Sequence, residues 1–138
     1  MRLAEKKTLT LEIAKHLANA AETAAAANRW TMVIAIVDDG GNLLYLERMD
    51  DAPLGSVEIA QLKARTAVRF KRPSKAFEDA LAGGRMAILG FPDVIPVEGG
   101  IPLLVEGRVV GAIGVSGGTA PQDTSVATAG VEAFSGVS

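Results

Sequence analysis

Apolar side chains near the start of the chain recur every three or four positions, which is the spacing of one face of an α-helix. A threonine at position 8 or 10 can cap this helix, because its hydroxyl accepts a hydrogen bond from the first turn. Asn28 ends the alanine-rich part of the segment. We therefore expect a helix over residues 8–27. Its buried face carries Leu9, Ile13, Leu17, Ala20 and Ala24.

Two apolar segments come next, at residues 31–37 and 42–48. The sequence Asp-Asp-Gly-Gly lies between them and is typical of a hairpin turn. The first segment is apolar on both faces, which favours a central strand. Residues 101–105 and 108–116 form a similar pair around a Glu-Gly turn, so we expect two β-hairpins.

The other periodic segments predict helices at residues 56–70, 74–81 and 121–134, with Ser56 as the cap of the first. Residues 85–100 mix glycine, proline and apolar residues without a period, which is typical of a functional loop or of short helical turns. Hairpins separated by helices favour an α/β (α+β) fold, an antiparallel sheet covered by helices. The 138 residues contain no linker, so we expect one domain over residues 1–138.

Composition and charge exclude several functional classes. The net charge is −2 and both signs are interspersed, so no nucleic-acid surface is expected. The chain has no cysteine, which excludes disulfides and thiolate sites. Its first eight residues lack the apolar core of a signal peptide, and no apolar run reaches the ~18 residues of a membrane span. We therefore expect no membrane partner and a cytoplasmic location.

Lys63 stands out because it lies on an apolar helix face, with Ile59, Thr66 and Phe70. A buried ammonium is costly unless it meets a carboxylate, a carbonyl or an anionic ligand. Alternatively, its stem can run along the apolar surface and leave the charge in water. Thr66 can add a hydroxyl to the same site.

Asp38 is the partner that we expect for Lys63, because a strand end and a helix can meet at one rim of the sheet. Its position before two glycines is equally consistent with simple turn chemistry, and the adjacent Asp39 has no assigned role. Arg48, at the end of the neighbouring strand, would leave an excess of positive charge. A guanidinium suits a carboxylate ligand, because it binds both oxygens at once.

His16 and Asp123 are the remaining candidates. His16 is the only histidine, and it lies about 60° from Ile13, at the margin of the helix's apolar face. That position suits a ligand of haem iron or another metal, and equally a structural histidine at a helix interface. Asp123 follows Gly117-Gly118 at the start of the last helix, where backbone N–H groups can hold an anion, although Asp123 can also simply cap that helix.

These motifs together resemble the GlcG/HbpS family, which includes a domain fused to some cobalamin adenosyltransferases. The resemblance rests on Val-Asp-Asp-Gly-Gly-Asn-Leu with Arg48-Met-Asp, on Ala60-x-x-Lys-Ala-x-Thr-Ala67, and on Gly99-Gly100-x-Pro. It continues through the glycine-rich block that ends at Gly118 and through Gln122-Asp123. The resemblance implies a profilin-like, five-stranded antiparallel sheet with helices on both faces. The fifth strand would then lie within residues 94–97.

Two functions follow from the resemblance, and whether the chain is an enzyme stays open. One is a homo-oligomeric module that binds a small molecule, with haem as a candidate cofactor and His16 as its metal ligand. The alternative is a small lyase acting on an aromatic or hydroxylamino carboxylate, with Lys63 and Asp38 as catalytic residues. The expected ligand-binding residues are Arg48, Thr66, Gly99, Gly100 and Asp123.

Overall fold

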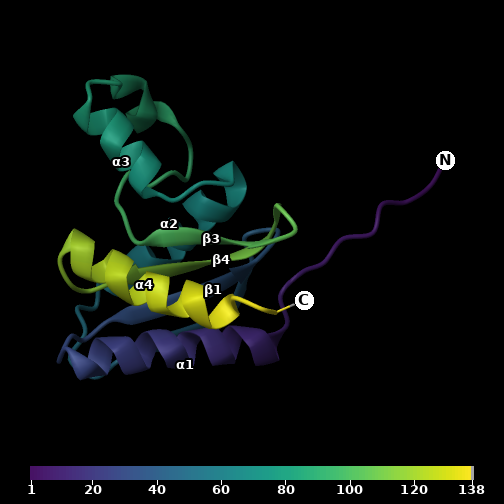
Figure 1. The fold of residues 1–138 in the computed structure, drawn as a ribbon. Helices are drawn as coiled ribbons and strands as arrows, with labels where there is room; N and C mark the ends of the chain where they lie inside the picture. The colour runs from purple at the N-terminus through teal and green to yellow at the C-terminus, as the bar shows by residue number, and fades with distance from the viewer. Residues whose placement is uncertain (138) are drawn as a thin grey trace.

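The computed structural model describes residues 1–137, and helices and strands alternate along them in the predicted order (Figure 1). The N-terminal arm, residues 1–8, is extended and leads away from the body. The elements are α1 (Leu11–Ala27), β1 (Val33–Asp38), β2 (Leu43–Arg48), α2 (Ser56–Phe70), α3 (Lys75–Ala82), the 3₁₀ turn η1 (Met86–Gly90), β3 (Gly100–Val105), β4 (Arg108–Ser116) and α4 (Ala120–Phe134).

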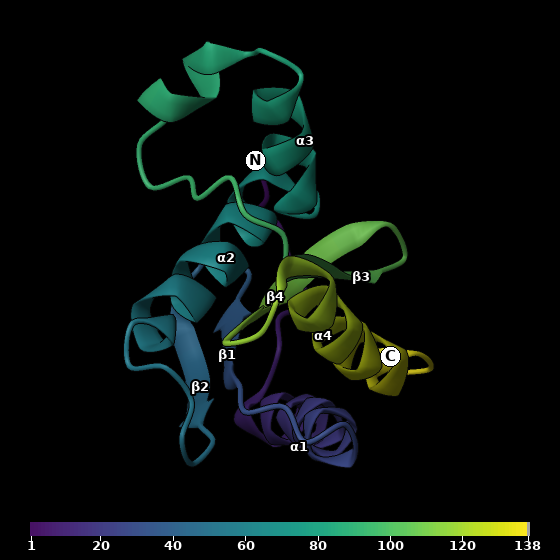
Figure 2. The ribbon, with the colours of Figure 1, turned by 90° about the vertical axis from the view of Figure 1, so that its left-hand side faces the viewer.

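The four strands of the described residues form one antiparallel sheet in the order β2-β1-β4-β3. The prediction that β1 is central is confirmed, since all but the last of its side chains are buried. Helix α2 covers one face of the sheet, while α1 and α4 cover the other (Figure 2). The expected antiparallel sheet with helices on both faces is therefore confirmed.

The expected fifth strand is wrong. Residues 94–97 are irregular, because side chains from other elements take up their backbone hydrogen-bonding groups. The N–H of Ile95 donates to the Thr66 hydroxyl at 3.0 Å, and the Val97 carbonyl accepts from the Ser74 hydroxyl at 2.6 Å. Pro96 has no N–H to offer a ladder. This segment is thus a loop fixed to α2 and to the start of α3.

A projection of residues 71–98 stands away from the sheet and carries α3 and η1 (Figures 1 and 2). Three aromatic rings hold its base together. The ring centroids of Phe70 and Phe77 are 5.1 Å apart, and those of Phe70 and Phe91 are 6.0 Å apart. Three of the chain's four phenylalanines therefore pack at the base of this projection and not in the core between the sheet and the helices.

Small residues let the layers approach closely, as the composition predicts. A Cβ added to Gly114 of β4 would lie 2.0 Å from the Ala60 carbonyl oxygen of α2. On the other face, a Cβ added to Gly130 of α4 would lie 2.6 Å from a methyl group of Ile113. Real Cβ atoms do not come so near, so Gly114, which faces backbone atoms, requires glycine, whereas a side chain at position 130 would have to displace the Ile113 methyl group.

The helix starts partly match the prediction. Thr10 caps α1, because its hydroxyl accepts from the Ile13 N–H at 3.2 Å. Ser56 was expected to cap α2, but it is the first helical residue, and its hydroxyl accepts from the Ser116 hydroxyl at 3.1 Å instead. Within residues 1–137, none of the helices combines the length and apolarity needed to cross a bilayer.

Candidate functional site

Lys63 is buried and paired with a carboxylate, which is the first of the two alternatives for its helix face. The side chain reaches from α2 to the end of the sheet where β4 ends and β3 begins, which we call the open end. The side chain is 1% exposed, and its ammonium donates to the Val115 carbonyl and to Asp123 Oδ2, each at 2.9 Å. The residue therefore joins the two helical layers around the end of the sheet.

Glycines at the start of β3 make room for this side chain. A Cβ added to Gly99 would lie 3.0 Å from the Lys63 ammonium nitrogen and 2.6 Å from the Val115 carbonyl oxygen. Gly99 also has a φ of +126°, which other residues rarely adopt. A Cβ on Gly100 would lie 2.1 Å from the Lys63 carbonyl oxygen. The pair Gly99-Gly100 therefore permits close approach of α2.

Asp123 supplies the carboxylate of the pair from the first turn of α4. It is 3% exposed, and its second oxygen, Oδ1, accepts from the Gly118 N–H at 2.9 Å. Burial raises the pKa of the Asp123 carboxyl, although the Lys63 ammonium and the Gly118 N–H act against that rise. The nearby Glu98 raises it further, and its carboxylate accepts from the Thr124 hydroxyl at 2.5 Å.

Two hydroxyl groups fix the loop that precedes Gly99. Thr66 is fully buried, and its hydroxyl accepts from Ile95 as described above. Ser74 was not predicted as a site residue, because its position after a proline indicates only a helix start. Its hydroxyl accepts from the Gly100 N–H at 2.9 Å, while its own N–H donates to the Gly100 carbonyl. Thr66 and Ser74 thus hold both sides of the segment that covers Lys63.

The expected pairing of Asp38 with Lys63 is wrong, because the two lie at opposite ends of the sheet. Val115 pairs with Ile34, and Asp38 is four residues further along β1, or about 13 Å. Asp38 Oδ1 accepts from the N–H groups of Gly40 and Asn42, each at 2.9 Å. Its observed role is the turn chemistry that was the alternative interpretation.

Arg48 lies at the open end of the sheet but does not join Lys63. It pairs with Val33, which in turn pairs with Ser116, so two strand spacings, or about 10 Å, separate Arg48 from β4. The Arg48 side chain is exposed and forms no ion pair among the described residues. The predicted cluster of Lys63, Asp38 and Arg48 is therefore not formed.

Asp39, which had no predicted role, ties down the N-terminal arm. Its carboxylate accepts from the Thr8 hydroxyl at 2.7 Å and lies 2.6 Å from the Lys6 ammonium. The hydrogen bond from Lys6 is the main reason that the pKa of the Asp39 carboxyl lies below its ordinary value. Leu9 continues the attachment, since its N–H donates to the Val110 carbonyl of β4 at 3.2 Å.

His16 is exposed on α1, which covers the face of the sheet opposite to α2. The imidazole makes no hydrogen bond within residues 1–137, where no group of three or more acidic or histidine side chains could hold a metal ion. Two hollows of about 550 and 240 Å³ open on the surface near the β3–β4 turn. Neither is lined by His16, Lys63 or Asp123, so the predicted site residues do not share one cavity.

Comparison with known proteins identifies relatives of this chain in sequence and in structure. Protein GlcG of Escherichia coli (strain K12) is 42% identical over 111 residues, 80% of this chain and 83% of GlcG. The crystal structure of Klebsiella pneumoniae protein ORFY matches with a TM-score of 0.94 and 32% identity, covering 100% of this chain and 98% of ORFY. The structure of a PduOC–heme complex matches with a TM-score of 0.84 and 30% identity, covering 93% and 96%.

The family model described as "Haem degrading protein HbpS-like" matches residues 9–132. That range includes the whole sheet, the helices on both of its faces and the Lys63–Asp123 pair. The chain therefore belongs to the HbpS-like family.

Proposed function

We propose that this chain is a small-molecule-binding domain whose ligand is haem. The observation that carries the proposal is the similarity, over nearly the whole chain, to the PduOC domain in its heme complex. Family membership supports the same ligand class. The solved structure of that relative is therefore a complex with a named ligand, which is haem.

His16 is the residue that we propose as the axial ligand of the iron. A neutral imidazole is a common haem ligand, and this one is exposed and has no hydrogen-bonding partner among residues 1–137. The His16 imidazole is therefore a suitable donor for haem iron. The surroundings within one copy are open, since the exposed neighbours one turn away on α1 are Glu12 and Asn19. A second chain would have to cover the haem.

Self-association, which the resemblance implies, would provide this cover. Large apolar side chains remain exposed on the body of the single copy: Leu11 is 48% exposed, Leu54 is 74% and Leu104 is 52%. Burying such side chains between copies would stabilise an oligomer. Light scattering at micromolar concentration is expected to give a mass above that of one chain, and a monomer in the presence of haem would contradict this part of the proposal.

Haem titration followed by absorption spectroscopy tests the proposal directly. The protein is expected to give a shifted Soret band that saturates at a fixed ratio of haem to chain. His16→Ala should change or abolish that band, while Lys15→Ala, an exposed neighbour on the same helix, should leave it unchanged. A saturating spectrum that is identical in His16→Ala would remove His16 from the site, and the absence of any saturable shift would overturn haem binding.

The lyase alternative gains no specific support. Its two catalytic candidates, Lys63 and Asp38, lie at opposite ends of the sheet, and the Lys63 ammonium already has two acceptors. The position of Lys63 on an apolar helix face also predicts from the sequence that Lys63→Met keeps the fold but loses ligand binding, and this prediction stays open. Circular dichroism and the haem titration, applied to that variant, test both halves of it.

A further inference from the structure

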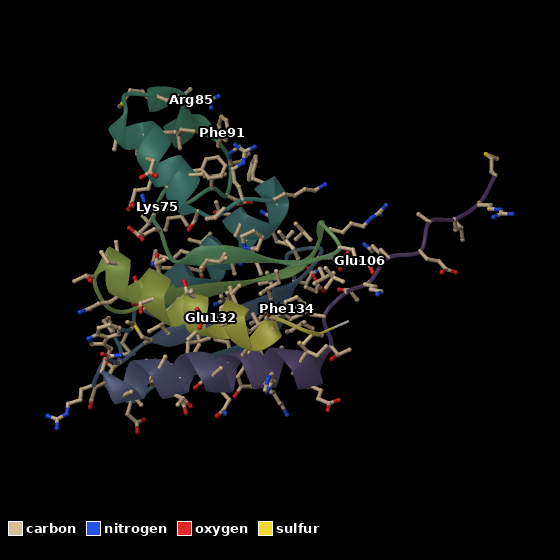
Figure 3. The ribbon with its side chains drawn as sticks, in the orientation of Figure 1. Lys75, Arg85, Phe91, Glu106, Glu132 and Phe134 are labelled. Atoms are coloured by element: carbon tan, nitrogen blue, oxygen red, sulfur yellow. The ribbon has the colours of Figure 1, made fainter. Side chains whose placement is uncertain are left out.

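A cleft of about 550 Å³ lies at the turn end of the β3–β4 hairpin. It is lined by residues 5–7 of the N-terminal arm, by residues 105–110 of the hairpin and by Lys71. Figure 3 shows Glu106 at the tip of the hairpin, beside the arm. The volume lies within the range of small-molecule sites. Along β4, Arg108 is about 23 Å from Val115, so the cleft is separate from the Lys63–Asp123 pair.

The cleft gathers positive charge on a chain whose net charge is −2. Four cationic side chains line it, namely Lys6, Lys7, Lys71 and Arg108, against the carboxylates of Glu5 and Glu106. Lys6 is already paired with Asp39. The other three cations are exposed and form no ion pair among residues 1–137. Their donors are therefore free for an anionic group.

Apolar surface adjoins these cations. Val105, Val109 and Val110 belong to the cleft, and Val110 is only 3% exposed. The hollow of about 240 Å³ is also lined by Lys7, Val105 and Val110, so the two spaces are neighbours. Its other apolar walls come from core-packed side chains at the ends of α1 and α4: Leu9, Ile13, Phe134 and Val137.

We propose that this cleft and the adjoining hollow bind a small amphipathic carboxylate. The carboxylate lies against Lys7, Lys71 and Arg108, where a guanidinium can bind both of its oxygens. The apolar body lies in the hollow, where it removes apolar surface from water. The site does not depend on the proposed haem binding, because its residues do not include His16.

Isothermal titration calorimetry of the full chain with sodium octanoate tests this site. Saturable binding is expected, and it should weaken as salt is added, because salt screens the exposed cations. The double variant Lys71→Gln/Arg108→Gln should bind octanoate at least about tenfold more weakly. The matched control, Lys15→Gln/Arg29→Gln, removes two exposed cations elsewhere and should bind octanoate as the unaltered chain does.

Shorter and simpler anions separate the amphipathic site from a bare patch of charge. Affinity should rise from acetate through butyrate to octanoate, since each added CH₂ group can bury more apolar surface. Inorganic phosphate should bind more weakly than octanoate. Equal affinity for acetate and octanoate, tighter binding of phosphate, or no saturable octanoate binding would each overturn the proposal. None of these outcomes bears on haem, whose titration is read at the Soret band.

Discussion

Cations lie at both ends of the β3–β4 hairpin, but the two groups differ in burial and in ion pairing. At the open end, the Lys63 ammonium is buried and bonded to Val115 and Asp123. At the turn end, Lys71 and Arg108 are exposed and have no ion pair among the described residues. A buried cation that is paired with a carboxylate inside the protein holds layers together, whereas an exposed cation without an ion pair can bind a ligand. The absence of an ion pair, rather than unusual burial, therefore distinguishes the cations at which we propose that an anion binds.

The largest effect is expected from breaking the pair at the open end. Asp123→Ala leaves the Lys63 ammonium buried without a countercharge, which should lower the free energy of unfolding by about 3–5 kcal/mol. Urea denaturation measures the loss. The matched control is Asp79→Ala, which removes the exposed partner of Lys75 and should cost less than about 1 kcal/mol. Similar small losses in both variants would show that the buried pair does not hold the layers.

A smaller loss is expected from Gly100→Ala, which keeps every charge. The added Cβ would meet the Lys63 carbonyl oxygen and carbon, and a backbone in the middle of a helix yields little. We expect a loss of about 1–3 kcal/mol in the same urea experiment. Gly55→Ala is the control, since nothing lies within 4 Å of the added Cβ there. Full stability of Gly100→Ala would mean that α2 can shift away from the sheet, and would return Gly100 to its predicted role in ligand binding.

The smallest expected effect is a difference between the two ends in how their contribution to stability depends on pH. The pKa of the Asp39 carboxyl is lowered, so its contribution to stability is present above the ordinary value of 3.8 and is lost as the pH falls through the lowered pKa. Burial raises the pKa of the Asp123 carboxyl instead, so the fall in pH that releases the Asp39 contact does not weaken the open end through this group.

Acidification is therefore expected to release the N-terminal arm before the sheet unfolds. Amide NMR signals of residues 5–8 should move toward random-coil positions as the pH falls, while those of β4 persist. In Asp39→Asn the arm signals should lack that acid transition. An arm that detaches at the same pH in the variant would show that Asp39 does not control it.

The local elements could be predicted from sequence because they depend on short-range periodicity. The buried Lys63 could be predicted too, since its helix face is apolar over several turns. Its partner could not. The sequence favours Asp38, but the strand register, together with the docking of α4, decides which acid lies at the open end, and that acid is Asp123.

The wrong prediction of a fifth strand has the same kind of cause. Residues 94–97 are apolar enough for a strand, but the hydroxyls of Thr66 and Ser74 take up their backbone groups from distant positions in the sequence. Nothing local marks Ser74 as more than the start of a helix. The cleft at the turn end could not be predicted from the sequence either, because it brings together residues 5–7, Lys71 and the hairpin turn.

The Lys63–Asp123 contact also has a consequence for synthesis on the ribosome, because its partners are 60 residues apart. Until α4 has left the exit tunnel, the Lys63 ammonium has no carboxylate to meet. It must then stay hydrated, which keeps α2 from settling fully against the glycines of β3 and β4. The nascent chain therefore completes its layers only after α4 has docked against the sheet.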